Sequence, residues 1–162
     1  MNWVDPIGLS RLTIHYTAGG SFSINNPRGQ SLIDTLQSTP NNSITLFQLN
    51  GHGNSSEQCI SAGTNCSDIL DSNLNVLSDG KIIGNVADLL NSKLSSSGEV
   101  DLAGCNNASG NENITKSTSD LLEDHPVRGG VWYQFGYENH WLFGNSSGSF
   151  GLKKTYINGL EQ

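Results

Sequence analysis

Long hydrophobic runs and clustered positive charge are both missing from this chain of 162 residues. No apolar stretch approaches the roughly 20 residues that a membrane-spanning helix requires, and the first ten residues lack the basic and apolar segments of a signal peptide. Eight Lys and Arg residues stand against fifteen Asp and Glu residues, which gives a formal charge of −7. Because binding to a phosphate backbone needs clustered positive charge, we expect no nucleic-acid partner. Because no long apolar stretch is present, we also expect no membrane span.

Cysteine is scarce, and its count is odd. Cys59 and Cys66 share one polar segment, where they either form a small local disulfide or remain two reduced thiols. Cys105 is left outside that pair. The Cys and His residues also lack the paired spacing of zinc ligands, so we expect no metal ion and no other cofactor.

Apolar segments with strand-like and helix-like spacing alternate along the chain, which has the length of a single domain. The expected strands are 11–19, 44–49, 98–105, 129–137, 140–144 and 152–159, and the expected helices are 29–40, 85–94 and 114–125. Segments 23–29 and 54–71 are expected to be loops. Strands alternating with helices predict an α/β layered fold with a mainly parallel central sheet.

Two local patterns refine that expectation. The uninterrupted apolar run from Ile44 to Leu49 is typical of a strand that is covered on both faces. The dipeptide Asp79-Gly80 lies between two apolar pieces, which favours a two-residue hairpin turn. We therefore expect a small hairpin flap beside the main sheet.

His52 and Cys105 occur in similar settings, in "LNGHGN" and "VDLAGCNNA", each just after an expected strand. Functional sites in open α/β sheets form where the carboxyl ends of strands meet loops. If the two strands are neighbours, the imidazole and the thiol emerge in one crevice. A cysteine beside a histidine suits nucleophilic attack on an acyl carbon.

Magnitudes indicate how such a pair would act. A neighbouring imidazole raises the thiolate fraction of a cysteine, but a more acidic thiol is a weaker nucleophile, so the net gain is only about a few-fold. Protonation of the leaving amine by His52 and binding of the oxyanion by backbone N–H groups each contribute about 10²–10³-fold. Gly53 and Gly104 allow close approach of the backbone, and the N–H groups of Gly53 and Cys105 are the expected oxyanion donors.

Other interpretations of these residues remain open. A histidine in a Gly-rich loop is commonly a turn residue, and a cysteine after a strand is commonly a small buried residue. Cys105 has a second possible histidine partner in His140, whereas His125 is placed as a helix-end residue. Asp101, Glu138 and His140 are candidate substrate-binding residues.

The ordered pair of motifs resembles the caspase-like cysteine peptidases of the legumain, gingipain and CHAT group, over approximately 44–137. In that group, an apolar strand ends in His-Gly and a later strand ends in Ala-Cys or Gly-Cys. The resemblance implies a three-layer fold, with a mainly parallel sheet flanked by helices, and a catalytic dyad of His52 and Cys105. The implied activity is cleavage of peptide bonds.

The amino-terminal stretch "NWVDPIGL" resembles the junction near the end of bacterial Rhs/YD-repeat proteins, where a shell precedes a variable toxin. The resemblance implies a junction and autocleavage linker at 1–9 and a toxin domain at 10–162. It also implies delivery into the cytoplasm of a target cell, as a type VI secretion effector, for interbacterial competition. The implied partners are a protein substrate in that cell, an immunity protein, and the Rhs shell before release.

Three functions therefore follow from the sequence. The leading one is a cysteine endopeptidase toxin. The second is an amidase or deamidase toxin that uses Cys105 with His140. The third is a binding toxin without chemistry, in which the thiol is structural.

Overall fold

The computed structural model describes residues 10–62, 66–131, 135–138, 147–150 and 152–162. The helices in these ranges are α1 (Gly29–Ser38), α2 (Ala87–Lys93) and α3 (Ile114–Leu121). The expected linker at 1–9 and the expected strand at 140–144 lie outside the described residues.

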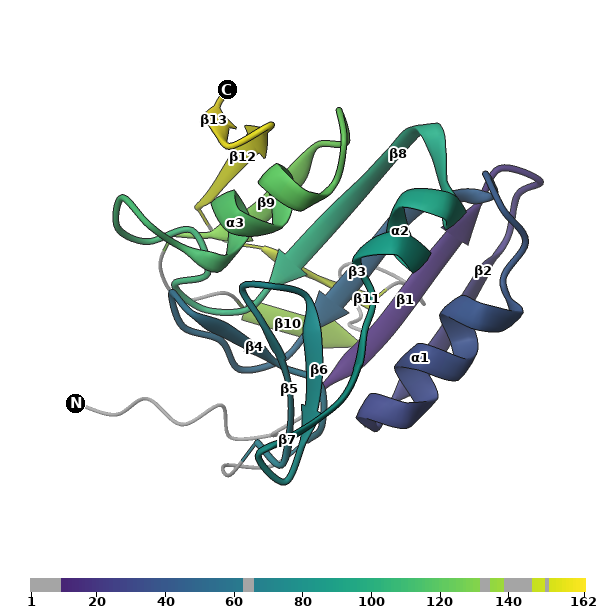
Figure 1. The fold of residues 1–162 in the computed structure, drawn as a ribbon, viewed down its shortest axis with the longest axis horizontal. Helices are drawn as coiled ribbons and strands as arrows, with labels where there is room; N and C mark the ends of the chain where they lie inside the picture. The colour runs from purple at the N-terminus through teal and green to yellow at the C-terminus, as the bar shows by residue number, and fades with distance from the viewer. Residues whose placement is uncertain (1–9, 63–65, 132–134, 139–146, 151) are drawn as a thin grey trace.

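Seven strands form the central sheet, in the order β13-β12-β9-β8-β3-β1-β2 (Figure 1). Their bounds are β1 (Arg11–Tyr16), β2 (Ser21–Asn25), β3 (Ile44–Asn50), β8 (Leu94–Ala103), β9 (Val127–Gly130), β12 (Lys153–Ile157) and β13 (Leu160–Glu161). The α/β class is confirmed, but the sheet is mixed rather than mainly parallel. Among the described strands, only β3 with β8 and β8 with β9 pair in parallel.

Short connections explain two of the four antiparallel pairs among the described strands of this sheet. Strands β1 and β2 are joined by only a few residues, as are β12 and β13, and such short connections permit only antiparallel pairing. Strand β2 lies partly in 23–29, which was expected to be a loop. The parallel pairs occur where a helix, α2 or α3, provides the longer crossover.

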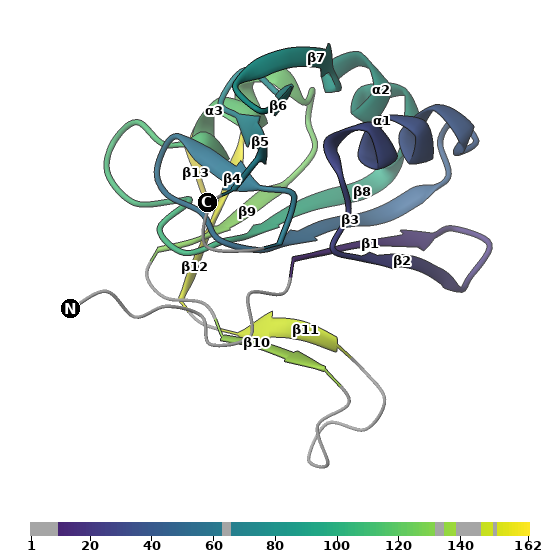
Figure 2. The same cartoon turned by 90° about the horizontal axis from the view of Figure 1, so that it is seen from below.

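The two faces of the central sheet differ. All three described helices lie on one face, where the side chains of Leu12, Phe47 and Leu102 are fully buried, and the β10–β11 pair lies on the other face (Figure 2). These two strands span Phe135–Glu138 and Ser147–Phe150. The expected helices on both faces and the apolar covering of β3 on both faces are therefore wrong.

The face without helices is polar because polar residues alternate with apolar ones along the strands. On β3, Gln48 and Asn50 alternate with Phe47 and Leu49, and only the apolar pair belongs to the core. The run from Ile44 to Leu49 looks continuous because its only strongly polar member is Gln48.

A second, four-stranded antiparallel sheet lies beside the first, in the order β4-β5-β6-β7. Its strands are β4 (Glu57–Cys59), β5 (Asp68–Asp71), β6 (Asn75–Ser78) and β7 (Lys81–Asn85). The expected hairpin is confirmed, with positive φ angles of 48° at Asp79 and 75° at Gly80. The flap is larger than expected, because 54–71 contains β4 and β5 instead of only a loop.

The helices agree with the expected segments in type. Leu32, Ile33 and Leu36 line the buried side of α1, as their spacing predicts. The Asn113 side chain caps the start of α3 by accepting a hydrogen bond of 2.9 Å from the Lys116 N–H. Helix α3 ends at Leu121, before the expected end at His125.

Candidate functional site

Strands β3 and β8 are parallel neighbours in the middle of the central sheet. Their last residues, Asn50 and Ala103, are paired across the two strands. His52 follows β3 by two residues, and Cys105 follows β8 by two residues. The condition that the two strands be neighbours is confirmed, so the two residues leave the same edge of the sheet.

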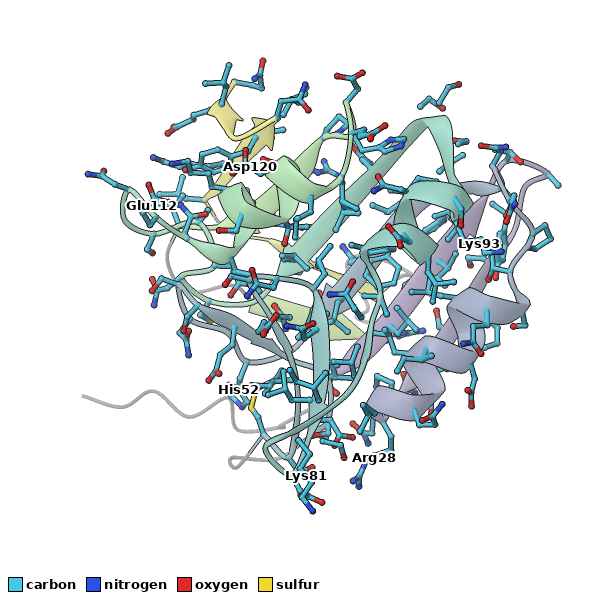
Figure 3. All side chains as sticks on the ribbon, viewed as in Figure 1. Arg28, His52, Lys81, Lys93, Glu112 and Asp120 are labelled. Atoms are coloured by element: carbon cyan, nitrogen blue, oxygen red, sulfur yellow. A yellow bond between two sulfur atoms is a disulfide. The ribbon has the colours of Figure 1, made fainter. Side chains whose placement is uncertain are left out.

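The His52 segment is held by the small sheet. The His52 carbonyl oxygen accepts hydrogen bonds from the Cys59 N–H at 2.7 Å and from Gln58 Nε2 at 3.1 Å. Gly53 and Gln58 form an isolated antiparallel bridge, whose hydrogen bonds use the His52 carbonyl and the Asn54 N–H. The Gly53 N–H takes part in neither bond. Figure 3 shows His52 beside the small sheet.

The His52 ring is partly buried. Its Nε2 atom is inaccessible to solvent and has no hydrogen-bond partner among the described residues. An unsatisfied buried ring nitrogen costs stability, and such groups are uncommon in folded proteins. Several other side-chain atoms of the described residues share this property, so burial without a partner does not by itself mark a functional atom.

Cys105 begins a turn that is anchored on the opposite side, to β9. The Ala108 N–H donates to the Gly130 carbonyl at 2.8 Å, and Ser109 Oγ donates to the Val131 carbonyl at 2.8 Å. Asn106 adopts a positive φ of 60°, which an asparagine accepts more readily than most residues. Cys105 is partly buried and lies outside the disulfide that joins Cys59 to Cys66.

The two segments touch through glycines. A side chain on Gly53 would overlap Asn107 Oδ1 and would lie 3.1 Å from the Gly104 Cα atom. A side chain on Gly104 would overlap Gln58 Oε1. The histidine segment and the cysteine turn therefore lie close together, and a side chain at either glycine would displace a buried amide.

No match was found when the chain was compared with protein-family models, curated proteins and solved structures. The chemistry of the site is therefore inferred from its own residues.

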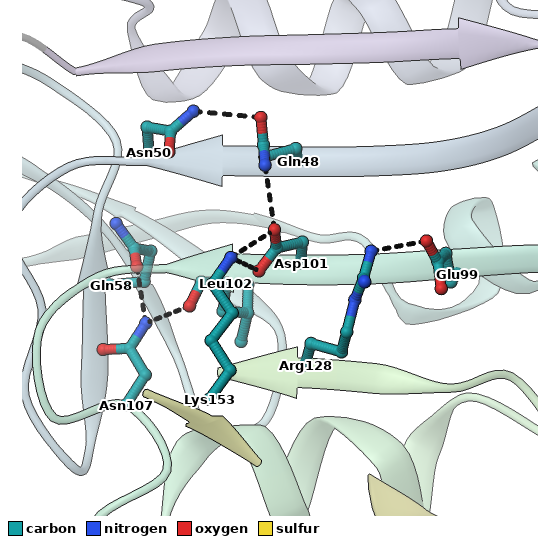
Figure 4. A network of polar contacts seen from close by, with 9 residues as sticks. All are labelled: Gln48, Asn50, Gln58, Glu99, Asp101, Leu102, Asn107, Arg128 and Lys153. Carbon is teal, nitrogen blue, oxygen red and sulfur yellow. Dashed lines mark hydrogen bonds and ion pairs between the residues drawn. The ribbon is translucent and has the colours of Figure 1, made fainter. Parts of the chain in front are cut away.

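Asp101 is 2% exposed and lies on the polar face of the sheet. It accepts hydrogen bonds from Lys153 Nζ at 2.7 and 2.9 Å and from Gln48 Nε2 at 2.8 Å (Figure 4). Asn50 extends this network by donating to Gln48 Oε1 at 3.2 Å. The acidic side chain predicted to bind substrate thus already has a cationic partner within the chain.

The other two predicted substrate-binding residues are only partly placed. Glu138 ends strand β10, and its side chain lies outside what the structure describes. His140 lies outside the described residues. His125, by contrast, is described, and its Nδ1 atom lies 3.0 Å from the Gly98 carbonyl oxygen, in the first half of β8.

Two polar residues of the site were not predicted from the sequence. Gln58 and Asn107 are both completely buried, and they hydrogen-bond to each other. Gln58 was assigned to a loop, and Asn107 appeared only as a letter of the quoted stretch "VDLAGCNNA". Their chemistry gave no signal, because buried amides are indistinguishable from surface ones in a chain so rich in Ser and Asn.

Other kinds of site were sought in the described part of the chain. It contains no group of three or more His, Cys, Asp or Glu side chains that could hold a metal ion. Its helices are all too short or too polar to cross a bilayer.

Proposed function

We propose that this chain is a cysteine endopeptidase in which Cys105 is the nucleophile and His52 the general acid and base. The observation that supports this most is the placement of the two residues just past the ends of neighbouring parallel strands, with Gly53 packed against Gly104. The side-chain space beside Gly53 and Gly104 is occupied by the Asn107 and Gln58 amides, which lets the two segments lie close together.

The proposed reaction has two halves. The Cys105 thiol gives its proton to His52 while its sulfur attacks the peptide carbonyl carbon, and the Gly53 and Cys105 N–H groups bind the resulting oxyanion. His52 then protonates the departing amine as the C–N bond breaks. Water attacks the thioester in the second half, releasing the carboxylate and restoring the thiol.

We assign the chain's biological role from its sequence motifs. The caspase-like resemblance supports a peptidase, and the Rhs-type junction at 1–9 supports a toxin that is released from a shell and delivered to the cytoplasm of a competing bacterium. A producing cell then needs an immunity protein that blocks the site.

New amino termini in intoxicated cells test this function. The wild-type chain and the His125→Ala variant should both generate the same new termini, whereas Cys105→Ala and His52→Ala should generate none. The His125→Ala variant is the matched control, because it removes a partly buried imidazole that lies beside Gly98, in the first half of β8.

The outcome also separates the alternatives. If Cys105→Ala and His52→Ala both fold and remain fully toxic, the peptidase function is wrong and a binding toxin is favoured. If His140→Ala abolishes activity while His52→Ala does not, the amidase or deamidase pairing of Cys105 with His140 replaces it.

A further inference from the structure

Gln58 and Asn107 are completely excluded from solvent at the junction of the two catalytic segments. Gln58 belongs to β4 of the small sheet, and Asn107 belongs to the turn that begins at Cys105. Burying two neutral amides costs free energy unless they are hydrogen-bonded. Their position therefore calls for a reason beyond filling space.

The amides form one chain of hydrogen bonds between the two segments. Gln58 Nε2 donates to the carbonyls of His52 and Cys59, at 3.1 and 3.0 Å, so Gln58 Oε1 faces the other way. That oxygen accepts from Asn107 Nδ2 at 2.5 Å, and the same Nδ2 donates to the Leu102 carbonyl at 3.2 Å (Figure 4). Because every neighbour of the two nitrogens is an acceptor, the orientation of both amides is fixed.

Gly53 and Gly104 both lie directly beside this amide pair. Gly53 packs on Asn107 Oδ1, which is buried and has no hydrogen-bond partner among the described residues. Gly104 packs on Gln58 Oε1 and on Asn107 Nδ2. The two amide side chains thus have two effects on these segments. They link the His52 segment to the Cys105 segment by hydrogen bonds, and their bulk sets the distance between the two backbones.

We infer that Gln58 and Asn107 are positioning residues, whose paired amides set the separation of the Gly53 and Cys105 N–H groups for binding an oxyanion. This inference rests on the proposed His52–Cys105 chemistry. Neither amide touches the substrate. Each acts through the backbone that it supports, so its loss should impair acyl transfer more than it impairs the thiol itself.

Two reactions of the full chain separate these effects. Iodoacetamide alkylates Cys105 when its sulfur displaces iodide at a CH₂ carbon, and no oxyanion forms. With p-nitrophenyl acetate, the sulfur–carbon bond forms at the acetyl carbonyl and an oxyanion develops. The ester C–O bond then breaks, p-nitrophenolate leaves with its electron pair, and the thiol proton passes to His52. The Cys105→Ala variant supplies the background rate.

The variants are Gln58→Met, Asn107→Ala and their combination. Each single change should lower the acylation rate by about 10-fold to 100-fold, while the alkylation rate changes by less than about 3-fold. The acylation rate of the double variant should be only slightly lower than that of the slower single variant, because the two amides act as one unit. Ile44→Val, a mildly destabilising change at the far end of β3, should alter neither rate.

Different outcomes separate a failure of the positioning role from a failure of the proposed His52–Cys105 chemistry. If His52→Ala leaves acylation unchanged, the dyad itself is wrong. If His52→Ala lowers acylation but every folded amide variant retains it, only the positioning role is wrong. That role is also wrong if acylation and alkylation fall together in the amide variants. Gln58→Met preserves side-chain volume, so it remains informative if Asn107→Ala fails to fold.

Discussion

Different kinds of residue make the contacts at the two ends of the β3–β8 strand pair. At the amino end, Ile44 and Leu94 pair across the strands and are fully buried, and the main chain around them is hydrogen-bonded, with Ser43 N donating to the Lys93 carbonyl. At the carboxyl end, the contacts are made by glycines and buried amides. Figure 3 shows His52 and Lys93 on opposite sides of the molecule.

The two ends of the strand pair contribute differently to the free energy of unfolding. Apolar burial at the amino end stabilises the pair of strands. At the carboxyl end, Asn50 Oδ1, His52 Nε2 and Asn107 Oδ1 are buried without hydrogen-bond partners among the described residues, whereas at the amino end Ser95 Oγ is. Each such group costs about 1–3 kcal/mol. Substitutions at the carboxyl end should therefore change activity, and those at the amino end should change only stability.

The largest effect is expected from Gly53→Ala. Its methyl group would overlap Asn107 Oδ1, which forces the His52 segment away from the cysteine turn. Displacing one oxyanion donor lowers the acylation rate of Cys105 by about 10²–10³-fold, as measured with p-nitrophenyl acetate. Ser97→Ala, at an exposed position in the first half of β8, is the control and should leave the rate unchanged.

The disulfide of the small sheet gives the next effect. Cys59 and Cys66 have Cα atoms 5.6 Å apart, and Cys59 also donates its N–H to the His52 carbonyl. Replacing both cysteines with serine should lower the free energy of unfolding by about 2–3 kcal/mol, the chain-entropy value for so short a loop. Urea unfolding of the double variant, compared with the wild type, measures this. An unchanged midpoint would mean that the carboxyl end needs no covalent support.

Asp68 is a buried carboxylate in β5, away from both ends of the β3–β8 strand pair, and it serves as a comparison. It accepts hydrogen bonds from Arg28 Nε, Gly29 N–H and Ser78 Oγ, at 2.7, 2.9 and 2.7 Å. Burial acts to raise the pKa of Asp68, but the hydrogen bonds from Ser78, Gly29 and Arg28, with the Arg28 charge, outweigh it and lower that pKa.

A lowered pKa means that the ionised Asp68 stabilises the fold above the unfolded-state value of about 3.9. Asp68→Asn should therefore reduce the free energy of unfolding by about 2 kcal/mol at neutral pH. The difference should shrink as the pH falls through the folded-state pKa, below about 4. Unfolding curves for both chains at several pH values check this, and a difference that grew on acidification would reverse the assignment.

The smallest effect is expected at the amino end. Ile44→Val removes one methyl group from a fully buried residue and should lower the free energy of unfolding by about 1 kcal/mol. The acylation rate per folded chain should be unchanged. If that rate fell as much as in Gly53→Ala, the two ends would not be functionally distinct.

Element types were largely predictable because local patterns report them. The spacing of Leu32, Ile33 and Leu36 predicted α1, and Asp79-Gly80 predicted the β6–β7 turn. Strand direction was not predictable in this way. The antiparallel pairing of β1 with β3 depends on where the chain re-enters the sheet after α1, and no local pattern records that choice.

The placement of His52 and Cys105 after neighbouring strands was predictable from the sequence, and the residues that support their segments were not. The reactivity of the pair stays a prediction. His52 and Cys105 stand out because rare reactive side chains follow apolar strands. Gln58 and Asn107 do not, because their importance comes from burial between segments 49 residues apart. Asp101 was recognisable as an acid on the cysteine strand, but its pairing with Lys153 depends on β12 returning beside β9.

The proximity of positions 52 and 105 underlies every step of this account. In a His52→Cys variant, dibromobimane, which fluoresces once it has joined two nearby thiols, should link position 52 to Cys105, and peptide mapping should find the two peptides joined. The His125→Cys variant should give no such link. If both thiols of the His52→Cys variant are instead alkylated singly while the chain is folded, the histidine and the cysteine do not share a site.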